Sequence, residues 1–322
     1  MDDCFWFARN GDTLIMRILP IELIPETMWK KQVLYLPGEL ITSYLVELKD
    51  RGLLQEAKQG TDRKDIHGGF SDKETLEHFT HRFGVSSGRS EFTILAPNED
   101  LTEYSDALLN TFSEGHIGLL DIPCGTGASC VTFLTVLAEL RARRVLPTLP
   151  LTISIVGGDC SMAAREICQS MLNRARTILA DQGIIINYNL TQWDATRNDE
   201  TAKMIDEWFK LASDACEYVV CISNFSGALI KGKMFDDFTP CLSQILARLH
   251  DKKSTLIWIE PINSNAVKGL IPKVFKWLNR YVPWFSNVHK KGEFPSAEYR
   301  MSNPINQHIH QTGVQVQRFV RD

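Results

Sequence analysis

The stretch GLLDIPCGTGASC, residues 118–130, decides the expected fold. It begins as an apolar run, reaches the carboxylate of Asp121, and continues into a turn that contains Gly125 and Gly127. Glycine has no Cβ, so a backbone built from it can approach a ligand closely. A helical pattern follows directly. The stretch therefore predicts a buried strand, a turn that can face a ligand, and the first turn of a helix.

The same order of strand, turn and helix continues downstream of residue 116. Five apolar, strand-like runs are each followed by a helical pattern, which predicts a parallel sheet covered by helices on both faces. Two further runs near the C-terminus are joined by a polar loop without a helix and are expected to pair antiparallel. The expected fold class is α/β, with a Rossmann-like, seven-stranded, mostly parallel sheet and an antiparallel C-terminal hairpin. The seven runs cover residues 117–122, 151–160, 184–195, 217–225, 254–261, 296–303 and 313–320.

The N-terminal part of the chain shows helical rather than strand-like patterns, except around QVLYLP, residues 32–37. Ser71 and Glu74 have the spacing of a capping box, and Gly84 is expected to end the helix that they begin. We therefore expect an N-terminal, mainly helical cap region over residues 1–115. The sheet domain is expected over residues 116–322.

The composition is that of an ordinary globular protein. The 322 residues are 44% hydrophobic and 23% charged, and the formal net charge is −4. That total argues against a broad, salt-dependent nucleic-acid surface, because such surfaces are usually basic. The eight cysteines form no CxxC pair, the N-terminal residues do not form a secretory signal, and no apolar run reaches the ~20 residues of a membrane span. These features predict a soluble, cytoplasmic protein without a transmembrane segment.

Three of the strand-like runs end in an acidic residue: Asp121, Asp159 and Asp194. Burying carboxylates is costly, so their recurrence at strand ends indicates a shared ligand. Ligands of open α/β sheets bind beyond the carboxyl ends of the strands. Asp159 can bind two ribose hydroxyls, Asp194 can accept from an adenine amino group, and Trp193 can cover a purine ring. The pattern predicts a site for a nucleoside-bearing cofactor.

The ordered set of motifs resembles the class I S-adenosylmethionine-dependent methyltransferases over about residues 110–322. LLDIPCGTGA is similar to the acid–x–glycine–x–glycine motif of that family, with a Pro-Cys pair in place of the usual first glycine. The closing antiparallel hairpin is also similar to that family. The resemblance implies S-adenosyl-L-methionine as the cofactor, with Asp121, Gly125 and Gly127 around its methionine part, Asp159 on its ribose and Trp193–Asp194 at its adenine. The other expected cofactor-binding residues are Pro123, Cys124, Thr126, Cys160, Ser161, Ser223, Asn224 and Phe225.

A nicotinamide-dependent Rossmann oxidoreductase is the main rival on the same fold class. That fold expects GxGxxG and a ribose-binding acid ~20 residues further on. Here Cys130 stands at the third glycine position, and Asp159 comes 32 residues after Gly127. Both differences favour the methyltransferase interpretation.

Two polar residues at later strand ends are catalytic candidates. In amino-group methyltransferases the motif after the fourth strand is typically Asn or Asp, two prolines and an aromatic residue. Here Asn224 fits the first position, but Phe225 and Ser226 replace the prolines. This difference puts N-methylation in doubt, and Asn224 can bind cofactor or acceptor or simply form a strand-end turn. Glu260 can act as a base or can cap the following helix.

Two features outside these motifs have both a functional and a structural interpretation. Arg82 can pair with the carboxylate of the cofactor, with Ser86 and Ser87 nearby, or it can be a solvated arginine at a helix end. The basic and aromatic residues of the segment 268–291 can form a substrate lid, a nucleic-acid or membrane-binding surface, or an amphipathic cover helix with solvent-exposed lysines.

Methyl transfer from S-adenosylmethionine is the expected function. His308 and His310 lack acidic or cysteine neighbours at ligand spacing, so no metal ion is expected. A small-molecule acceptor is slightly preferred, while RNA and protein acceptors and the oligomeric state stay open. Two alternatives remain: a cofactor- or nucleotide-sensing interaction protein without turnover, and an enzyme that transfers the aminocarboxypropyl group.

Overall fold

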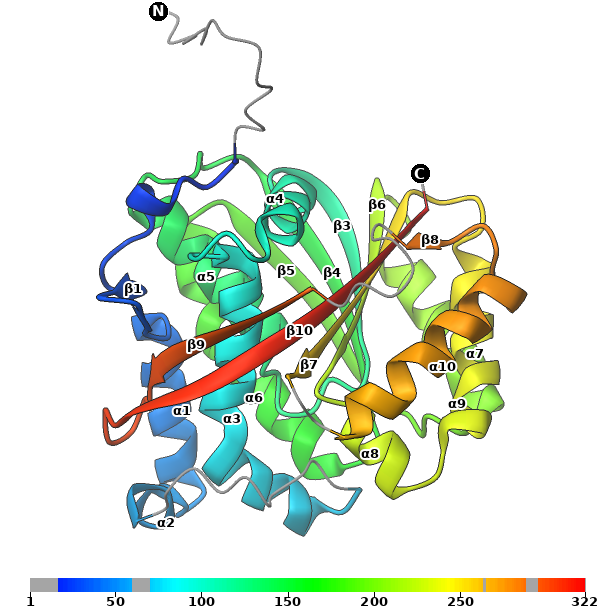
Figure 1. Ribbon diagram of the computed structural model, residues 1–322, viewed down its shortest axis with the longest axis horizontal. Coiled ribbons are helices and arrows are strands. Elements are labelled where there is room, and N and C mark those ends of the chain that lie inside the picture. The colour runs from blue at the N-terminus through cyan, green and yellow to red at the C-terminus, as the bar shows by residue number, and fades with distance from the viewer. Residues whose placement is uncertain (1–16, 60–69, 263–264, 288–294, 322) are drawn as a thin grey trace, which may run out of the picture.

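The protein forms a mixed α/β structure around one mostly parallel sheet (Figure 1). The computed structural model describes residues 17–59, 70–262, 265–287 and 295–321. All seven strand-like runs expected from the sequence form strands. The strands are β1 (Trp29–Lys30), β2 (Val33–Leu34), β3 (Gly115–Asp121), β4 (Leu151–Asp159), β5 (Ile184–Gln192), β6 (Glu217–Ser223), β7 (Ser254–Pro261), β8 (Ser286–Asn287), β9 (Ser296–Ser302) and β10 (Ile309–Arg321).

The strand order across the sheet is β1-β2-β9-β10-β7-β6-β3-β4-β5, and β8 pairs with β10. Strands β5, β4, β3, β6 and β7 are parallel neighbours. Strand β10 runs antiparallel to both β7 and β9, so the expected C-terminal hairpin is present and its second strand lies inside the sheet. The strand order of the parallel part reverses between β3 and β6, which is the switch point of the sheet.

The expected number of seven strands is wrong, because the sheet described here has ten. Three strands of two residues each, β1, β2 and β8, add to the seven long ones. Strand β2 pairs parallel with β9, and β1 pairs with β2, so the N-terminal part of the chain extends one edge of the sheet. A strand of two residues is too short to show the alternation by which longer strands are recognised in a sequence, although β2 lies within the stretch QVLYLP at residues 32–37. Whether residues 1–115 form a region separate from 116–322 stays a prediction.

Helices cover both faces of the sheet (Figure 1). One face carries α1, α3, α5 and α6, and the other carries α7, α8, α9 and α10. This arrangement buries the parallel strands on both sides, as their apolar sequences require. The helices are α1 (Gly38–Asp50), α2 (Leu54–Gln59), α3 (Asp72–Leu95), α4 (Thr102–Thr111), α5 (Cys130–Ala142), α6 (Met162–Asp181), α7 (Asn198–Leu211), α8 (Ser226–Lys231), α9 (Phe235–Arg248) and α10 (Asn265–Tyr281), with a 3-10 turn at Ile21–Leu23.

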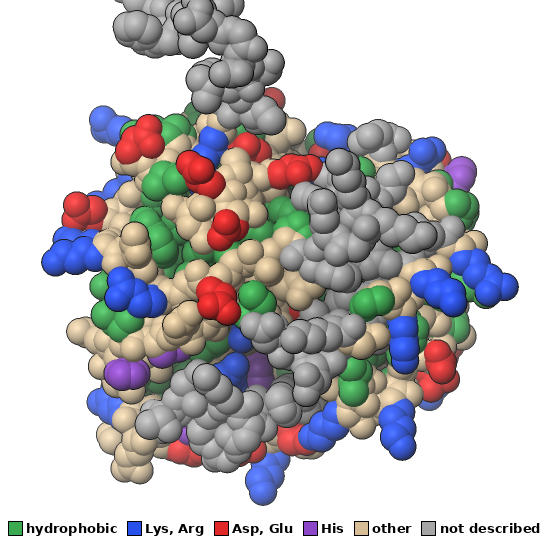
Figure 2. Space-filling view, viewed as in Figure 1, with side chains coloured by type: hydrophobic (Ala, Val, Ile, Leu, Met, Phe, Trp, Pro, Cys, Tyr) green, Lys and Arg blue, Asp and Glu red, His purple; other side chains and the backbone are tan. Residues whose placement is uncertain are grey.

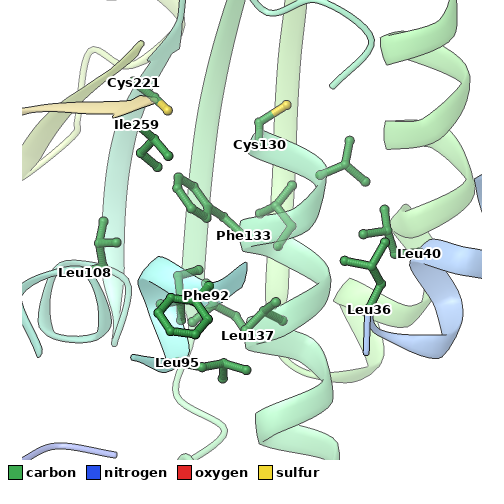
Figure 3. Packing of buried hydrophobic residues seen from close by; sticks show 14 of the residues in the cluster. Leu36, Leu40, Phe92, Leu95, Leu108, Cys130, Phe133, Leu137, Cys221 and Ile259 are labelled. Atoms are coloured by element: carbon green, nitrogen blue, oxygen red, sulfur yellow. The ribbon is translucent and has the colours of Figure 1, made fainter. Parts of the chain in front are cut away.

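Apolar packing fixes α3 against the sheet and α5. Figure 3 shows Phe133 and Leu137 of α5 close to Phe92 and Leu95 of α3, within the larger cluster on this face. Each of these four side chains is at most 2% exposed. Full burial of such a side chain stabilises the fold by about 1.5–3 kcal/mol. The N-terminal helix α3 is therefore held firmly beside the turn that follows β3.

Helix α3 is longer than the sequence indicates. Its start was predicted correctly: Ser71 Oγ accepts from the Glu74 N–H, and the Glu74 carboxylate accepts from the Ser71 N–H. The expected end at Gly84 is wrong, because the helix continues to Leu95. Gly84 serves packing instead, since a Cβ there would lie 2.8 Å from Cδ of Pro304.

Helix α10 on the opposite face is amphipathic. Val274 and Leu278 are buried in the apolar cluster on this face of the sheet, whereas Lys273, Lys276 and Arg280 are exposed. Figure 2 shows basic side chains on this part of the surface. This arrangement favours the cover-helix interpretation for the described residues of the segment. Among the helices of the described residues, none has the length and apolar character that a bilayer crossing requires.

Candidate functional site

A cavity of about 430 Å³ opens at the carboxyl ends of β3, β4, β5 and β6. Loops that follow these four strands line it, and α3 contributes a further wall. Its position at the switch point and its size are those of ligand sites in open α/β sheets. The lining residues are Phe70, Thr75, His78, Ser86, Pro123, Cys124, Gly125, Thr126, Ala128, Asp159, Cys160, Ala164, Trp193, Asp194, Ala195, Thr196, Ser223, Asn224, Phe225, Ala228 and Met234.

The two glycines of the turn after β3 serve different needs. Gly125 lines the cavity with a φ of +50°, and a Cβ there would meet no atom within 4 Å. Gly127 has a φ of +83° but does not line the cavity. A Cβ on Gly127 would lie 2.9 Å from Cγ2 of Val131 and 3.1 Å from Sγ of Cys168, so this glycine lets the turn pack on α5 and α6. Pro123, Cys124 and Thr126 line the cavity beside Gly125.

Asp159, the last residue of β4, binds the glycine turn and faces the cavity. Its Oδ2 accepts from the Gly125 N–H at 3.0 Å, and its Oδ1 accepts from the Ser161 N–H at 2.8 Å. A carboxylate oxygen has two lone pairs, so each oxygen can accept one further hydrogen bond. Burial raises the pKa of Asp159, while the two backbone bonds lower it. Cys160 also lines the cavity, whereas Ser161 caps α6 by accepting from the Ala164 N–H.

Trp193 and Asp194 follow β5 and line the next part of the cavity. Trp193 is 1% exposed, and its Nε1–H donates to Thr201 Oγ1 at 2.9 Å, which fixes the indole. Gly158 of β4 lets Trp193 pack closely against this strand, because a Cβ at residue 158 would lie only 2.9 Å from Trp193 Cβ. The Asp194 carboxylate accepts from the N–H and Oγ1–H of Thr196 at 2.9 and 2.8 Å. Two of the three acidic strand ends thus meet in one cavity.

The third acidic residue, Asp121, lies beneath the turn and does not line the cavity. The side chain is 1% exposed, and neither carboxylate oxygen has a hydrogen-bond partner among the described residues. Burial raises the pKa of Asp121 to about 7, and the nearby N–H and thiol of Cys130 and the thiol of Cys221 offset this only in part. Asp121 pairs with Gly157, two residues before β4 ends at Asp159, so β4 reaches further toward the cavity.

Helix α3 lines the cavity with Thr75, His78 and Ser86. Thr75 and His78 were not predicted, although their spacing with Ser86 places all three on one helical face. Arg82 shares this face by spacing but does not line the cavity, so its pairing with a cofactor carboxylate stays a prediction. Ser86 Oγ is buried and has no hydrogen-bond partner among the described residues.

Serine hydroxyls connect α3, the glycine turn and the end of β6. Ser90 Oγ and Ser129 Oγ lie 2.9 Å apart, and Ser129 Oγ–H donates to Ser223 Oγ at 2.7 Å. Ser223 lines the cavity together with Asn224 and Phe225. These hydrogen bonds hold the three cavity-forming segments in fixed relative positions.

Glu260 fixes the backbone after β6 and does not line the cavity. Its Oε1 accepts from the N–H groups of Phe225 and Ser226, both at 2.9 Å, and from Trp258 Nε1–H at 2.7 Å. The residue is 2% exposed, and burial raises its pKa. These contacts give Glu260 a positioning role at the start of α8, which precedes it in the chain. The expected capping of the helix that follows Glu260 falls on residues 263–264, which lie outside the described residues. The catalytic role of Glu260 stays a prediction.

Polar contacts tie the start of α3 to two other elements near the cavity. Lys231 Nζ of α8 pairs with the Glu74 carboxylate of α3 at 3.1 Å. Asp72 Oδ1 accepts from Ser161 Oγ–H at 2.7 Å and from the Ala163 N–H at 3.1 Å, at the start of α6. The Ser71 hydroxyl, followed by the Lys231 ammonium, lowers the pKa of Glu74 to about 2. The first turn of α3 is therefore anchored on both sides.

Comparisons with known proteins leave the site to be interpreted from its own residues. No family model and no curated protein matches this sequence. One matching solved structure comes from work on the "Conversion of a Disulfide Bond into a Thioacetal Group during Echinomycin Biosynthesis", with a TM-score of 0.34 and 11% sequence identity. The match covers 67% of this chain and 80% of that chain. A likeness of this degree carries no argument about function.

Proposed function

We propose that the protein is an S-adenosylmethionine-dependent methyltransferase whose cofactor occupies the cavity at the ends of β3 to β6. The observation that carries the proposal is the placement of Asp159. Its carboxylate bridges the glycine turn and the start of α6 through two backbone N–H groups, and it still faces the cavity with lone pairs to spare. A vicinal diol, such as that of a ribose, is the ligand group that two adjacent carboxylate oxygens can bind together.

The neighbouring residues fit the rest of an adenosyl group. The Trp193 indole is held by its bond to Thr201, and the half-buried Asp194 carboxylate can accept from an exocyclic amino group. Gly125 leaves open space where a side chain would otherwise project, so its backbone can approach the ligand. Ser86 Oγ offers a buried hydroxyl that no described residue uses. The cavity therefore contains groups that complement the ribose and the adenine of the cofactor, whereas Asp121, Gly127 and Arg82, expected at its methionine part, do not line it.

The bound cofactor would supply a methyl group on a sulfonium, which is a strong electrophile without help from the protein. The residues of this chain then have to align cofactor and acceptor and exclude water. A base is needed only when the acceptor must lose a proton. His78 is the imidazole that lines the cavity within the described residues, and it is the candidate for that proton transfer.

A small-molecule acceptor suits this cavity better than a macromolecule. The helices α3 and α8 both line the cavity and are joined by the Glu74–Lys231 ion pair. Apolar side chains of Phe70, Phe225 and Met234 provide further walls. A largely apolar cavity with a few polar groups is typical of small-ligand sites.

Transfer of a labelled methyl group tests the proposal. The purified protein is incubated with methyl-labelled S-adenosylmethionine and a small-molecule extract, and label in a new compound is measured. We expect wild-type protein to label an acceptor, Asp159→Asn to label it at least tenfold more slowly at low cofactor concentration, and the exposed control Asp181→Asn to match wild type. Binding of the cofactor without any label transfer would contradict methyl transfer and favour the sensor alternative.

A further inference from the structure

One wall of the cavity carries a buried hydroxyl whose hydrogen bonding is incomplete. Ser86 of α3 is 1% exposed and lines the cavity, and its Oγ has no hydrogen-bond partner among the described residues. Serine and threonine hydroxyls inside helices often donate to the carbonyl four residues earlier, as Thr80 and Thr93 of the same helix do at 2.7 and 2.8 Å. A buried hydroxyl without a partner destabilises the fold, so its place at a cavity wall indicates a ligand that completes its hydrogen bonding.

Helix α3 connects the proposed ribose site with the position of Ser86. At its N-terminal part, Thr75 lines the cavity, and its Oγ1–H donates to Ser161 Oγ at 2.9 Å, two residues after Asp159. Ser86 follows eleven residues after Thr75, which is about 16 Å along the helix axis. The two hydroxyls of α3 therefore lie at separate parts of the cavity wall, and Thr75 is the one beside the ribose site.

The contacts next to Ser86 lead to the ends of β3 and β6. One helical turn further on, Ser90 Oγ lies 2.9 Å from Ser129 Oγ, in the turn that follows β3. Arg89 Nη1–H donates to the side-chain carbonyl of Asn224, directly after β6. Residues three and four positions apart on a helix share one face. Ser86 therefore faces the part of the cavity that lies at the ends of β3 and β6.

The strand order sets the direction in which the cofactor extends from its ribose. The neighbouring strands are β5, β4, β3 and β6 in that order. In the proposed function, the adenine lies after β5 at Trp193 and Asp194, and the ribose lies at the end of β4 at Asp159. The adenine and the sulfur-bearing chain are attached to the two ribose carbons that flank the ring oxygen, so the chain leaves the ribose away from the adenine. The sulfur and the α-amino acid beyond it therefore extend toward β3 and β6, where Ser86 lies.

We infer that Ser86 binds the α-amino-acid end of the cofactor. This inference rests on the proposed function. A hydroxyl can donate to the carboxylate of that group or accept from its ammonium, so either contact completes the hydrogen bonding of Ser86 Oγ. Ser86 thereby supplies a contact to the part of the cofactor at which Asp121, Gly127 and Arg82 were expected, although these three residues do not line the cavity.

Ser87 provides a matched control for this role. Its side chain is 0% exposed, and its Oγ also has no hydrogen-bond partner among the described residues, but it does not line the cavity. Ser86→Ala and Ser87→Ala each remove one unpaired buried hydroxyl, so neither should lower the midpoint of urea denaturation of the ligand-free protein. Only Ser86→Ala should weaken the binding of a ligand.

Two ligands that differ at the amino-acid end test the inference. S-Adenosylhomocysteine carries the α-amino acid, whereas 5′-methylthioadenosine has only a methyl group on the same sulfur. Calorimetric titration gives the dissociation constant of each compound for wild type and for both variants. We expect Ser86→Ala to bind S-adenosylhomocysteine at least about tenfold more weakly, because a hydrogen bond to a charged group is lost. Its affinity for 5′-methylthioadenosine, and both affinities of Ser87→Ala, should stay within about twofold of wild type.

The outcomes separate this inference from the proposed function. Failure of the wild-type protein to bind either compound at millimolar concentration would reject the proposed function itself. When the wild-type protein binds both, a smaller loss of S-adenosylhomocysteine affinity in Ser86→Ala, or an equal loss for both compounds, overturns the role of Ser86 alone. An equal loss of S-adenosylhomocysteine affinity in Ser87→Ala, or a lower urea midpoint in Ser86→Ala, would assign the hydroxyl to the structure of α3 and would also overturn it.

Discussion

Replacing Asp121 with asparagine should remove a pH dependence of folding stability. Asp121 is 1% exposed, and burial raises its pKa from an ordinary 3.8 to about 7. Between these values the folded protein keeps a proton on Asp121 that the unfolded chain releases, so the free energy of unfolding falls as the pH rises and levels off above pH ~7. A shift of about 3 pKa units corresponds to at most ~4 kcal/mol, of which about 2 kcal/mol is lost between pH 5 and pH 7.

The neutral amide of Asp121→Asn has no proton to lose in this range. Urea denaturation of wild type and variant at several pH values between 5 and 8 gives the difference in their free energies of unfolding. The subtraction cancels the contributions of Asp159 and Glu260, whose pKa values are also raised by burial. The variant should gain about 2 kcal/mol relative to wild type from pH 5 to pH 7. A difference that stays constant within ~0.5 kcal/mol would refute the argument that Asp121 is buried without adequate hydrogen bonding.

Substitutions at three further residues, two of them with a control variant, test the site and its surroundings. Asp159→Asn has only one acceptor oxygen for two backbone N–H groups and a ligand diol. We therefore expect calorimetry to show about 10- to 100-fold weaker binding of S-adenosylmethionine. An unchanged affinity would contradict the role of this residue. Glu260→Ala leaves three buried N–H donors without an acceptor and should lower the free energy of unfolding by at least ~2 kcal/mol. Glu260→Gln keeps an acceptor oxygen, so its loss of stability should be about half as large or less. Equal losses for the two variants in urea denaturation would rule out the proposed hydrogen bonds. Gly158→Ala places a Cβ 2.6 Å from Met204 Sδ and should lower the free energy of unfolding by ~1–3 kcal/mol. The control Gly38→Ala, whose Cβ would meet no atom within 4 Å, should leave this free energy unchanged. An unchanged free energy of unfolding in Gly158→Ala would show that the packing around residue 158 is loose.

The sheet could be predicted well because each long strand has a recognisable pattern in its own stretch of sequence. Apolar runs bounded by turn residues mark each parallel strand, and the lack of a helix between β9 and β10 marks the antiparallel hairpin. The errors come from contacts that the local pattern does not contain. Gly84 looked like a helix end, but Pro304, more than 200 residues away, requires the glycine inside α3. The two-residue strand β2 pairs with β9, which is far away in the sequence, and β1 pairs with β2.

The candidate site was predictable where it depends on strand ends. Parallel strands end at the same edge of a sheet, so acids at the ends of β4 and β5 had to come close together, and Asp159 and Asp194 line one cavity. Asp121 differs because its strand ends earlier in the register, which leaves the carboxylate beneath the turn. The contribution of α3 to the cavity could not be predicted in the same way. The hydrogen bond between Arg89 of α3 and Asn224, for example, joins residues 135 positions apart, and no spacing in the sequence reveals such a pair.

The central claim is that the cavity at the ends of β3 to β6 binds an adenosyl cofactor of the sulfonium type. Calorimetric titration of the wild-type protein with S-adenosylmethionine, S-adenosylhomocysteine and NAD tests it most directly. We predict one binding site per chain for each of the two sulfur compounds, mutual competition between them, and no competition by NAD. Binding of NAD with displacement of S-adenosylhomocysteine, or no binding of either sulfur compound at millimolar concentration, would contradict the account.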